Sequence, residues 1–161
     1  MHTLLRFLYL ISLVFWIGTI FFFSTSAAPS IFKVLPKQLA GDLVTDIFPK
    51  YYLISYVCGV FAIATSLLSW LTGSHSSTML YLLRVVILAI MLGLAIYAGA
   101  VIRPQTLEKR TEMRSLTKDS PRHSELHNRF NTLHKRSVLL NSVVFLLGIA
   151  IVFITAYNYR E

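Results

Sequence analysis

The residues best suited to chemistry lie in the last third of the chain, where His134, Ser137 and Asn141 follow one another at intervals of three and four residues. On a helix this spacing places the three side chains on one face. Asn141 lies within an apolar run, where an unpaired amide is costly. We predict that these groups either hydrogen-bond to neighbouring helices or line a polar pocket, in which the histidine relays protons or ligates a cofactor.

A longer polar stripe contains two of these residues. The members of this stripe are spaced seven residues apart, which keeps their side chains on one face of a helix. They are His127, His134, Asn141, Gly148 and Thr155. We predict that this face points into a helix bundle. Arg84 is the one cation well inside an apolar segment. Its long stem either reaches outward to the lipid headgroups or brings a positive charge to the polar pocket.

Two histidines are weak candidates for a metal site. His123 and His127 have the i, i+4 spacing that presents two imidazoles to one ion, and a third ligand would have to come from His134 or Glu125. The sequence contains neither an HExxH motif nor a cysteine pair, since Cys58 is the only cysteine. We therefore predict no metal site, and copper is disfavoured because the four methionines form no cluster.

Haem would need two axial histidines at similar depth. Of the five histidines, only His2 and His75 are expected near the outer face, while the other three are expected near the inner face. We predict no cofactor, with haem between His2 and His75 as the alternative.

The composition identifies the elements that must position these residues. Of 161 residues, 55% are hydrophobic and only 14% are charged, and the mean hydropathy is +0.65, whereas soluble domains carry roughly 25% charged residues. Four stretches reach the length of about 20 residues that a helix needs to cross a bilayer: residues 4–24, 51–72, 79–102 and 138–157. Hydrocarbon leaves no backbone group unpaired. The sequence therefore predicts an all-α, four-helix integral membrane bundle that forms one domain over residues 1–161.

The connections between the spans carry further helices. Residues 38–48 alternate leucine and isoleucine with acidic residues at helical spacing, which predicts a cytoplasmic interfacial helix; a re-entrant segment is the alternative. Residues 103–137 are predicted to form a charged cytoplasmic loop. Within it, Ser120 and Pro121 are typical of a helix start, so we expect the fourth helix to begin there and to run unbroken into its span.

Small residues predict where the helices pack. Close contact in lipid relies on such residues, and the second span places Ser55, Gly59, Ala62 and Ser66 on one stripe. The third span offers two pairs, Ala89 with Gly93 and Ala95 with Gly99. The six-residue GSHSST segment at 73–78 is predicted to be the turn of a hairpin between these two spans.

The net charge of +8 is concentrated between spans. Nine Lys and Arg residues lie at 103–137 and three at 33–50, against Arg6 and Arg160 on the opposite side. Because basic loops stay in the cytoplasm, we predict an inner-membrane protein with both termini outside the cytoplasm and with anionic lipid headgroups as partners. Nucleic acid is excluded, since no aromatic residues interleave the basic surface.

The first span has an alternative interpretation as a cleaved secretory signal. The segments MHTLLR and STSAAPS flank an apolar run from Phe7 to Phe23. That run has 17 residues, longer than the roughly 7–15 of a signal core, so we predict that the span is retained. Cleavage would place the mature start at Ala27 or Ala28.

Four separated segments carry a family resemblance: FWIGTIFF, AAPSIF, LAGDLVTDIFPKYY and FNTLHKRSVLLN. Together they resemble the transmembrane-protein-205-like family, which includes a bacterial domain of unknown function with four predicted helices. The resemblance places these residues at family motif positions: Trp16, Gly18, Pro29, Ala40, Gly41, Phe48, Pro49, Tyr51, His134, Ser137 and Asn141.

The resemblance also implies a class of function. A eukaryotic member is associated with platinum-drug resistance, and more distant four-helix relatives are linked to copper uptake or haem synthesis, although this chain lacks an evident metal-ligand set. We therefore expect a small transport or resistance-related membrane factor that is not an enzyme. The alternatives are a structural or accessory subunit of a membrane complex, a homo-oligomer, and a haem- or metal-associated redox protein.

Overall fold

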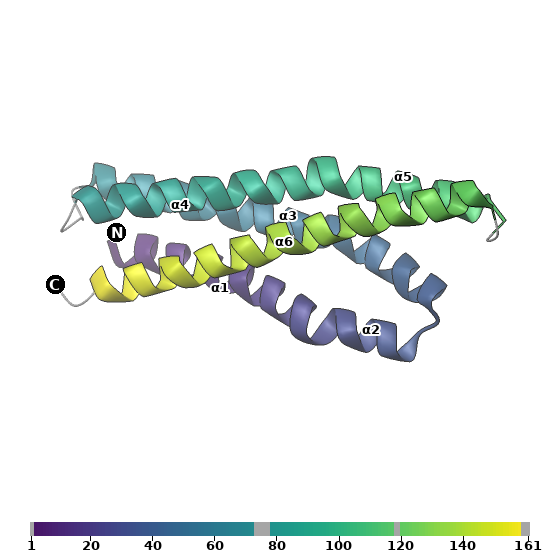
Figure 1. Ribbon diagram of the computed structural model, residues 1–161. Helices are drawn as coiled ribbons and strands as arrows, with labels where there is room; N and C mark the ends of the chain where they lie inside the picture. Colours follow the sequence, from purple (N-terminus) through teal and green to yellow (C-terminus); the bar gives the residue numbers. More distant parts are fainter. Residues whose placement is uncertain (1, 73–77, 118–119, 159–161) are drawn as a thin grey trace.

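The computed structural model describes residues 2–72, 78–117 and 120–158, and these residues form helices and short connections only (Figure 1). The elements in chain order are α1 (His2–Phe22), η1 (Phe23–Ala27), α2 (Ala28–Val34), α3 (Lys37–Leu71), α4 (Thr78–Tyr97), η2 (Ala98–Ile102), α5 (Arg103–Arg114) and α6 (Pro121–Asn158). The predicted all-α class is confirmed. The GSHSST turn and His75 lie outside the described residues, apart from the backbone of Thr78.

Within the described residues, four continuous helical rods are long and apolar enough to cross a membrane, at His2–Val34, Lys37–Leu71, Met79–Arg114 and Pro121–Tyr157. Only 22% to 33% of the most apolar window of each rod is buried inside the protein. Most of the apolar side chains therefore face outward, as expected of helices surrounded by lipid. This composition and architecture indicate an integral membrane protein.

Two of the rods change from α-helix to π-helix at one point each, and both changes precede a proline. In η1 the N–H of Ala28 bonds to the carbonyl of Phe23, and in η2 the N–H of Arg103 bonds to the carbonyl of Ala98. Pro29 and Pro104 follow two residues after each turn. A proline ring clashes with the carbonyl four residues earlier, and here that carbonyl lies within the wider π-helical turn. The widening lets both helices continue past their prolines.

The structure corrects two predicted connections. Residues 38–48 do not form a separate interfacial helix, because α3 runs without a break from Lys37 to Leu71 with Pro49 inside it. Residues 103–137 are not a loop, because α4 continues through η2 into α5. The real break after the first rod is at Leu35, which is extended, since the residue before a proline is forced out of the helical region.

The long fourth helix is confirmed. It begins at Pro121 and runs through the span to Asn158, and the Ser120 hydroxyl accepts a hydrogen bond of 3.2 Å from the backbone N–H of His123. This is the N-cap that the Ser-Pro sequence predicts.

Small residues allow the helices to pack closely in the core. The stripe of Ser55, Gly59, Ala62 and Ser66 on α3 is buried, as predicted, and a Cβ on Gly59 would lie 3.0 Å from the Trp16 ring. The predicted pair of Ala95 on α4 and Gly99 on η2 is also buried. The Ala89–Gly93 pair is exposed instead, so that packing prediction is wrong.

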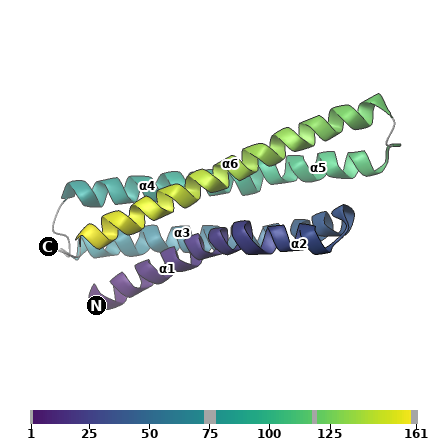
Figure 2. The same cartoon turned by 60° about the horizontal axis from the view of Figure 1, so that its bottom comes forward.

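The rods are not packed equally along their length. The start of α1 and the end of α6 lie at one end of the bundle, here named the terminal end, and the opposite end is named the charged end. At the charged end, α2 with the first half of α3 forms one hairpin and α5 with the first half of α6 forms another (Figure 2). The two hairpins diverge from each other, and the contacts that join them are the main polar feature of the molecule.

Candidate functional site

The four residues of the predicted polar pocket do not meet. Arg84 lies towards the terminal end, with its guanidinium carbon 5.5 Å from the centre of the Tyr9 ring. The Tyr9 hydroxyl lies 3.2 Å from Thr155 near the end of α6. Ser137 lies 18 residues earlier on that helix, about 27 Å away along the axis. Arg84 is therefore remote from the other three residues.

The polar stripe of α6 is buried only in its second half. Gly148 and Thr155 are buried, Asn141 is half-buried, and His127 and His134 are exposed. The His134 ring stacks on Phe130, with centroids 6.2 Å apart. The prediction that the whole stripe faces the bundle is wrong for the two histidines, because α5 packs against a different face of this half of α6, the face that includes the buried Leu126.

The candidate metal-ligand set is not assembled among the described residues. The rings of His123 and His127 stack in parallel with centroids 6.5 Å apart, and no group of three His, Cys, Asp or Glu side chains in the described parts of the chain could hold a metal ion. At the terminal end, His2 Nδ1 lies 3.5 Å from the Thr72 hydroxyl. Its proposed haem partner, His75, is outside the described residues.

Ser137 belongs to a different cluster, formed by aromatic side chains of α3. The Tyr52 hydroxyl lies 3.4 Å from the Ser137 hydroxyl, which joins α3 to α6. Phe48, Tyr51 and Tyr52 are in ring contact with one another, and Phe23 of η1 packs on Phe48 and Tyr51 with centroid distances of 5.5 Å. We name this set the aromatic cluster.

The second π-helical turn contacts the same cluster. Gly99 of η2 is buried, and a Cβ there would lie 2.1 Å from the Tyr56 hydroxyl and 2.7 Å from the Tyr52 ring. Glycine is therefore required for η2 to approach α3 this closely. Both π-helical turns meet the aromatic cluster, and such turns are frequent at functional sites.

A network of polar contacts, here named the Arg110 clamp, joins the two hairpins at the charged end. From α5, Arg110 donates to the Gln38 carbonyl at 3.0 Å, the Thr45 hydroxyl at 2.6 Å and Asp42 at 3.1 Å. It also donates to the Gly41 carbonyl. Arg114, one turn further along α5, donates to the same Asp42 carboxylate.

Gly41 makes this contact sterically possible. A Cβ at this position would lie 2.3 Å from an Arg110 nitrogen and 2.7 Å from the guanidinium carbon. The Arg110 side chain is only 17% exposed, and burial, followed by the nearby Arg114 charge, lowers its pKa below the ordinary value of arginine. Its many acceptors compensate for this desolvation.

Sequence reasoning did not find the clamp. It singled out Gly41 only through the family resemblance, and it counted Arg110 and Arg114 as part of a topology signal. The sequence feature that could have indicated the clamp is AGD, residues 40–42, near the start of a helix. Gly41 has no side chain and so leaves space for a guanidinium, and Asp42 supplies a carboxylate to bind it.

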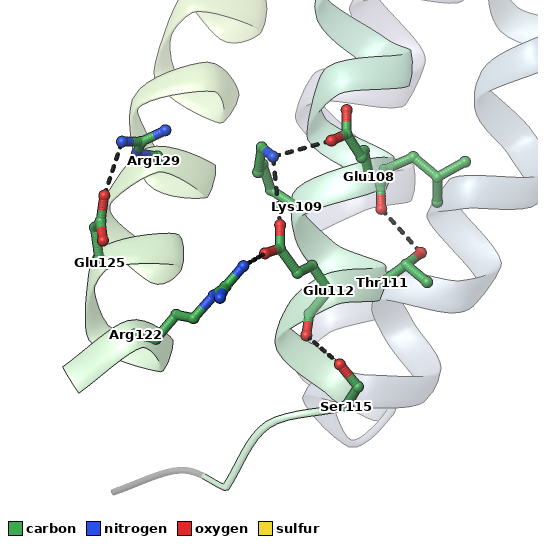
Figure 3. Close-up of polar contacts among 9 residues, drawn as sticks. Glu108, Lys109, Thr111, Glu112, Ser115, Arg122, Glu125 and Arg129 are labelled. Atoms are coloured by element: carbon green, nitrogen blue, oxygen red, sulfur yellow. Dashed lines mark hydrogen bonds and ion pairs between the residues drawn. The ribbon is translucent and has the colours of Figure 1, made fainter. Parts of the chain in front are cut away.

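Ion pairs organise the α5–α6 hairpin itself (Figure 3). Arg122 at the start of α6 donates to Glu112 at 2.8 Å, and Lys109 lies 3.3 Å from the other oxygen of that carboxylate. Lys109 also contacts Glu108 at 3.0 Å, and Glu125 pairs with Arg129 at 2.7 Å. The hydrogen bonds from Arg122 and Lys109 lower the pKa of Glu112, and those to Glu108 and Glu112 raise the pKa of Lys109.

A family assignment follows from the same stretch that contains the aromatic cluster and the clamp. The family model described as "Domain of unknown function (DUF4149)" matches residues 11–115. The chain belongs to this family. Its description gives no activity, and the match does not confirm the transmembrane-protein-205-like assignment. The comparisons with curated proteins and with solved structures found no match.

The matched region covers α3, α4, α5 and most of α1, and it ends before α6. Among the motif residues inside it, Trp16, Ala40 and Tyr51 are almost fully buried. Phe48 lies in the aromatic cluster and Gly41 in the clamp. Gly18, Pro29 and Pro49 are exposed; nothing lies within 4 Å of a Cβ on Gly18, so packing does not explain that glycine.

Proposed function

We propose that this protein is an accessory membrane protein that presents the α5–α6 hairpin to a partner at the membrane surface. The observation that carries the proposal is the rigid extension of the hairpin beyond the apolar spans. Helix α6 starts at Pro121, whereas its apolar span starts at Val138. The 17 residues between them correspond to about 25 Å of helix.

This extension exceeds what anchoring in the membrane requires. The headgroup region on each side of a bilayer is about 5–8 Å thick. A helix that merely ended at the interface would need one or two further turns. The ion pairs of Glu112 with Arg122 and of Glu125 with Arg129 hold the extension in place, and cations outnumber acids on its surface. Its charge suits a partner with an acidic surface.

The packing of the core favours this function over transport. Between the Tyr9–Thr155 contact at one end and the Tyr52–Ser137 contact at the other, the interior is filled by side chains that are 0% to 1% exposed, and these are Leu13, Trp16, Leu88 and Met91. A conduction path would have to displace these side chains, because interiors packed in this way leave few voids.

Site-specific photocrosslinking in native membranes tests the proposal. The exposed His127 on the hairpin and the exposed Phe153 in the apolar span are each replaced by a photoreactive phenylalanine. We expect a discrete protein adduct from position 127 and none of the same mass from position 153. Position 127 yielding no protein adduct, or an adduct of twice the chain mass that identifies a second copy, would contradict the accessory role.

A transport or resistance role is the second candidate, and one observation favours it. Arg103 has a buried Nε atom without a hydrogen-bond partner among the described residues, and it lies about one helical turn after Gly99, which packs against Tyr52 and Tyr56. A buried, incompletely paired cation beside hydroxyl groups is a site where an anionic solute could bind.

Complementation of a deletion strain separates the two candidates. Under toxic-ion or drug stress, Tyr52→Phe and Ser137→Ala should abolish complementation at normal protein level and thermal stability if the protein is a transporter. Tyr97→Phe is the matched control, since this tyrosine is 47% exposed on α4. Full complementation by all three variants would contradict transport.

A further inference from the structure

A groove between α5 and α6 combines three cations with two amide side chains. Its volume is about 510 Å³, and its lining includes Lys109, Arg129, Arg136, Gln105 and Asn128, together with one carboxylate, Glu125, which is paired with Arg129. We propose that this groove binds the phosphate group of an anionic phospholipid. The inference is independent of the proposed function, because a lipid can occupy the groove whether or not the hairpin also docks a protein.

The Arg136 end of the groove lies at the level in the membrane where lipid headgroups are found. Arg136 lies two residues before the start of the apolar span at Val138. Arg129 lies seven residues further out on the same face, about 10 Å along the helix axis. The Arg136 end of the groove therefore lies in the layer just outside the hydrocarbon core, where the phosphates of the lipids lie, and the Arg129 end extends beyond that layer into water.

One of the three cations is available for a ligand. Lys109 is engaged by Glu108 and Glu112, and Arg129 is engaged by Glu125. Within the described parts of the chain, Arg136 has no ion-pair partner, and its side chain is exposed. A guanidinium presents two parallel N–H donors that fit two phosphate oxygens. Arg136 is thus the residue expected to make the main contact.

The amides complete a donor set for phosphate oxygens. Gln105 lines the groove from α5 and Asn128 lines it from α6, and each carries an NH₂ group. Thr132 also lines the groove, but its hydroxyl donates to the backbone carbonyl of Asn128 at 3.0 Å. The hydroxyl proton is therefore not available to a ligand. The remaining donors come from both helices, so a bound phosphate would bridge α5 and α6.

The surface next to the groove favours a lipid over a free anion. Leu133 lines the groove itself. Directly below it on the same face of α6, near the start of the span, Leu139 is 64% exposed and Val143 is 36% exposed. A phospholipid bound through its phosphate can place its acyl chains on this apolar surface, which a free phosphate ion cannot use.

Lipid titration of the purified full-length protein tests the proposal. Binding of phosphatidylglycerol, of phosphatidylcholine and of inorganic phosphate is measured by native mass spectrometry from detergent. Arg136→Gln should weaken phosphatidylglycerol binding at least ten-fold, as expected for loss of a bidentate charged contact. Lys135→Gln is the matched control, because this neighbouring cation is exposed and does not line the groove; its loss of general surface attraction should change binding by no more than about five-fold.

Arg136→Lys provides a second variant that keeps the charge. It should bind more weakly than wild type and more tightly than Arg136→Gln, since only the fork geometry is lost. Equal effects of Arg136→Gln and Lys135→Gln would overturn the proposal in favour of diffuse attraction. Equal affinity for phosphatidylcholine, or full competition by millimolar inorganic phosphate, would also overturn it. Lipid-free thermal unfolding of each variant verifies that the protein is folded.

Discussion

The two hairpins at the charged end have surfaces of opposite character. The α2–α3 hairpin exposes large apolar side chains, with Phe32 50%, Val34 76%, Leu39 56% and Leu43 42% exposed. The α5–α6 hairpin instead exposes charged residues, and its buried contact is limited to a few side chains such as Leu126. Both hairpins consist of two helices and lie at the same end of the bundle. The difference in their surroundings is therefore inferred from their exposed side chains.

This difference indicates how each hairpin relates to the lipid. Exposed leucine, valine and phenylalanine are favourable in the interfacial layer of a membrane and unfavourable in water. Ion-paired helices are favourable in water and costly in hydrocarbon. We infer that the α2–α3 hairpin lies against the membrane and that the α5–α6 hairpin projects into water. The Arg110 clamp then joins the α2–α3 hairpin at the membrane interface to the α5–α6 hairpin in water.

The largest expected contrast is in membrane depth. Spin labels are placed at Val34 and His127, both exposed, in a background in which the buried Cys58 is replaced by serine. We expect the label at 34 to be more accessible to oxygen than to a water-soluble nickel complex and the label at 127 to show the reverse. If both labels were more accessible to the same reagent, the two hairpins would not differ in their membrane environment.

The clamp itself is tested by a double-mutant cycle. Gly41→Ala should destabilise the protein by about 1 kcal/mol in thermal or denaturant unfolding, because the lost guanidinium contacts outweigh the better helix propensity of alanine. In an Arg110→Ala background the same change should stabilise α3 by roughly 0.5 kcal/mol. Gly93→Ala is the control and should be neutral or stabilising, since nothing lies within 4 Å of its Cβ. A destabilisation that persists without Arg110 would show that the clamp is not the cause.

A smaller effect is expected from the carboxylate of the clamp. Asp42→Asn keeps the shape of the side chain and removes the charge that Arg110 and Arg114 share. Since the aspartate is 45% exposed, we expect a loss of about 0.5 kcal/mol. High salt should reduce the difference between variant and wild type, and a difference that increases with salt would contradict the electrostatic explanation.

The smallest effect is confined to the α5–α6 hairpin and depends on pH. Hydrogen bonds from Arg122 and then Lys109 hold the pKa of Glu112 below its ordinary value of 4.5. A depressed pKa contributes stability that is present above the unfolded value and is lost as the pH falls through the folded value. Hydrogen exchange in α5 should therefore accelerate as the pH falls below about 4.5, after correction for the intrinsic rate. Glu112→Gln should remove this dependence, and an unchanged profile would show that the carboxylate is not involved.

The contrast between the hairpins also explains which parts of the structure could be predicted. Some features follow from local sequence patterns, and these were predicted correctly. They are the membrane-spanning helices, predicted from apolar runs of bilayer length, the N-cap at Ser120, and the packing of the small-residue stripe around Gly59. The clamp depends on residues about 70 positions apart whose pairing no local pattern specifies. The candidate polar pocket was only partly realised, because heptad spacing shows which side chains share a face but not which face of α6 the neighbouring helix α5 covers. A proline inside a helix ordinarily breaks or kinks it, but the π-helical turns before Pro29 and Pro104 allow these helices to continue.

The π-helical turn at Ala98–Ile102 has a consequence for the orientation of everything after it. A π-helical turn accommodates one residue more than an α-helical turn, and each residue of an α-helix advances the side chains by about 100° around the axis. If the same residues formed regular α-helix with none deleted, α5 would be rotated by about that angle relative to α4. Arg110 would then point away from Gly41, although every residue of the clamp would still be present. The angular phase of the helix, set more than two turns upstream, thus determines whether these side chains meet.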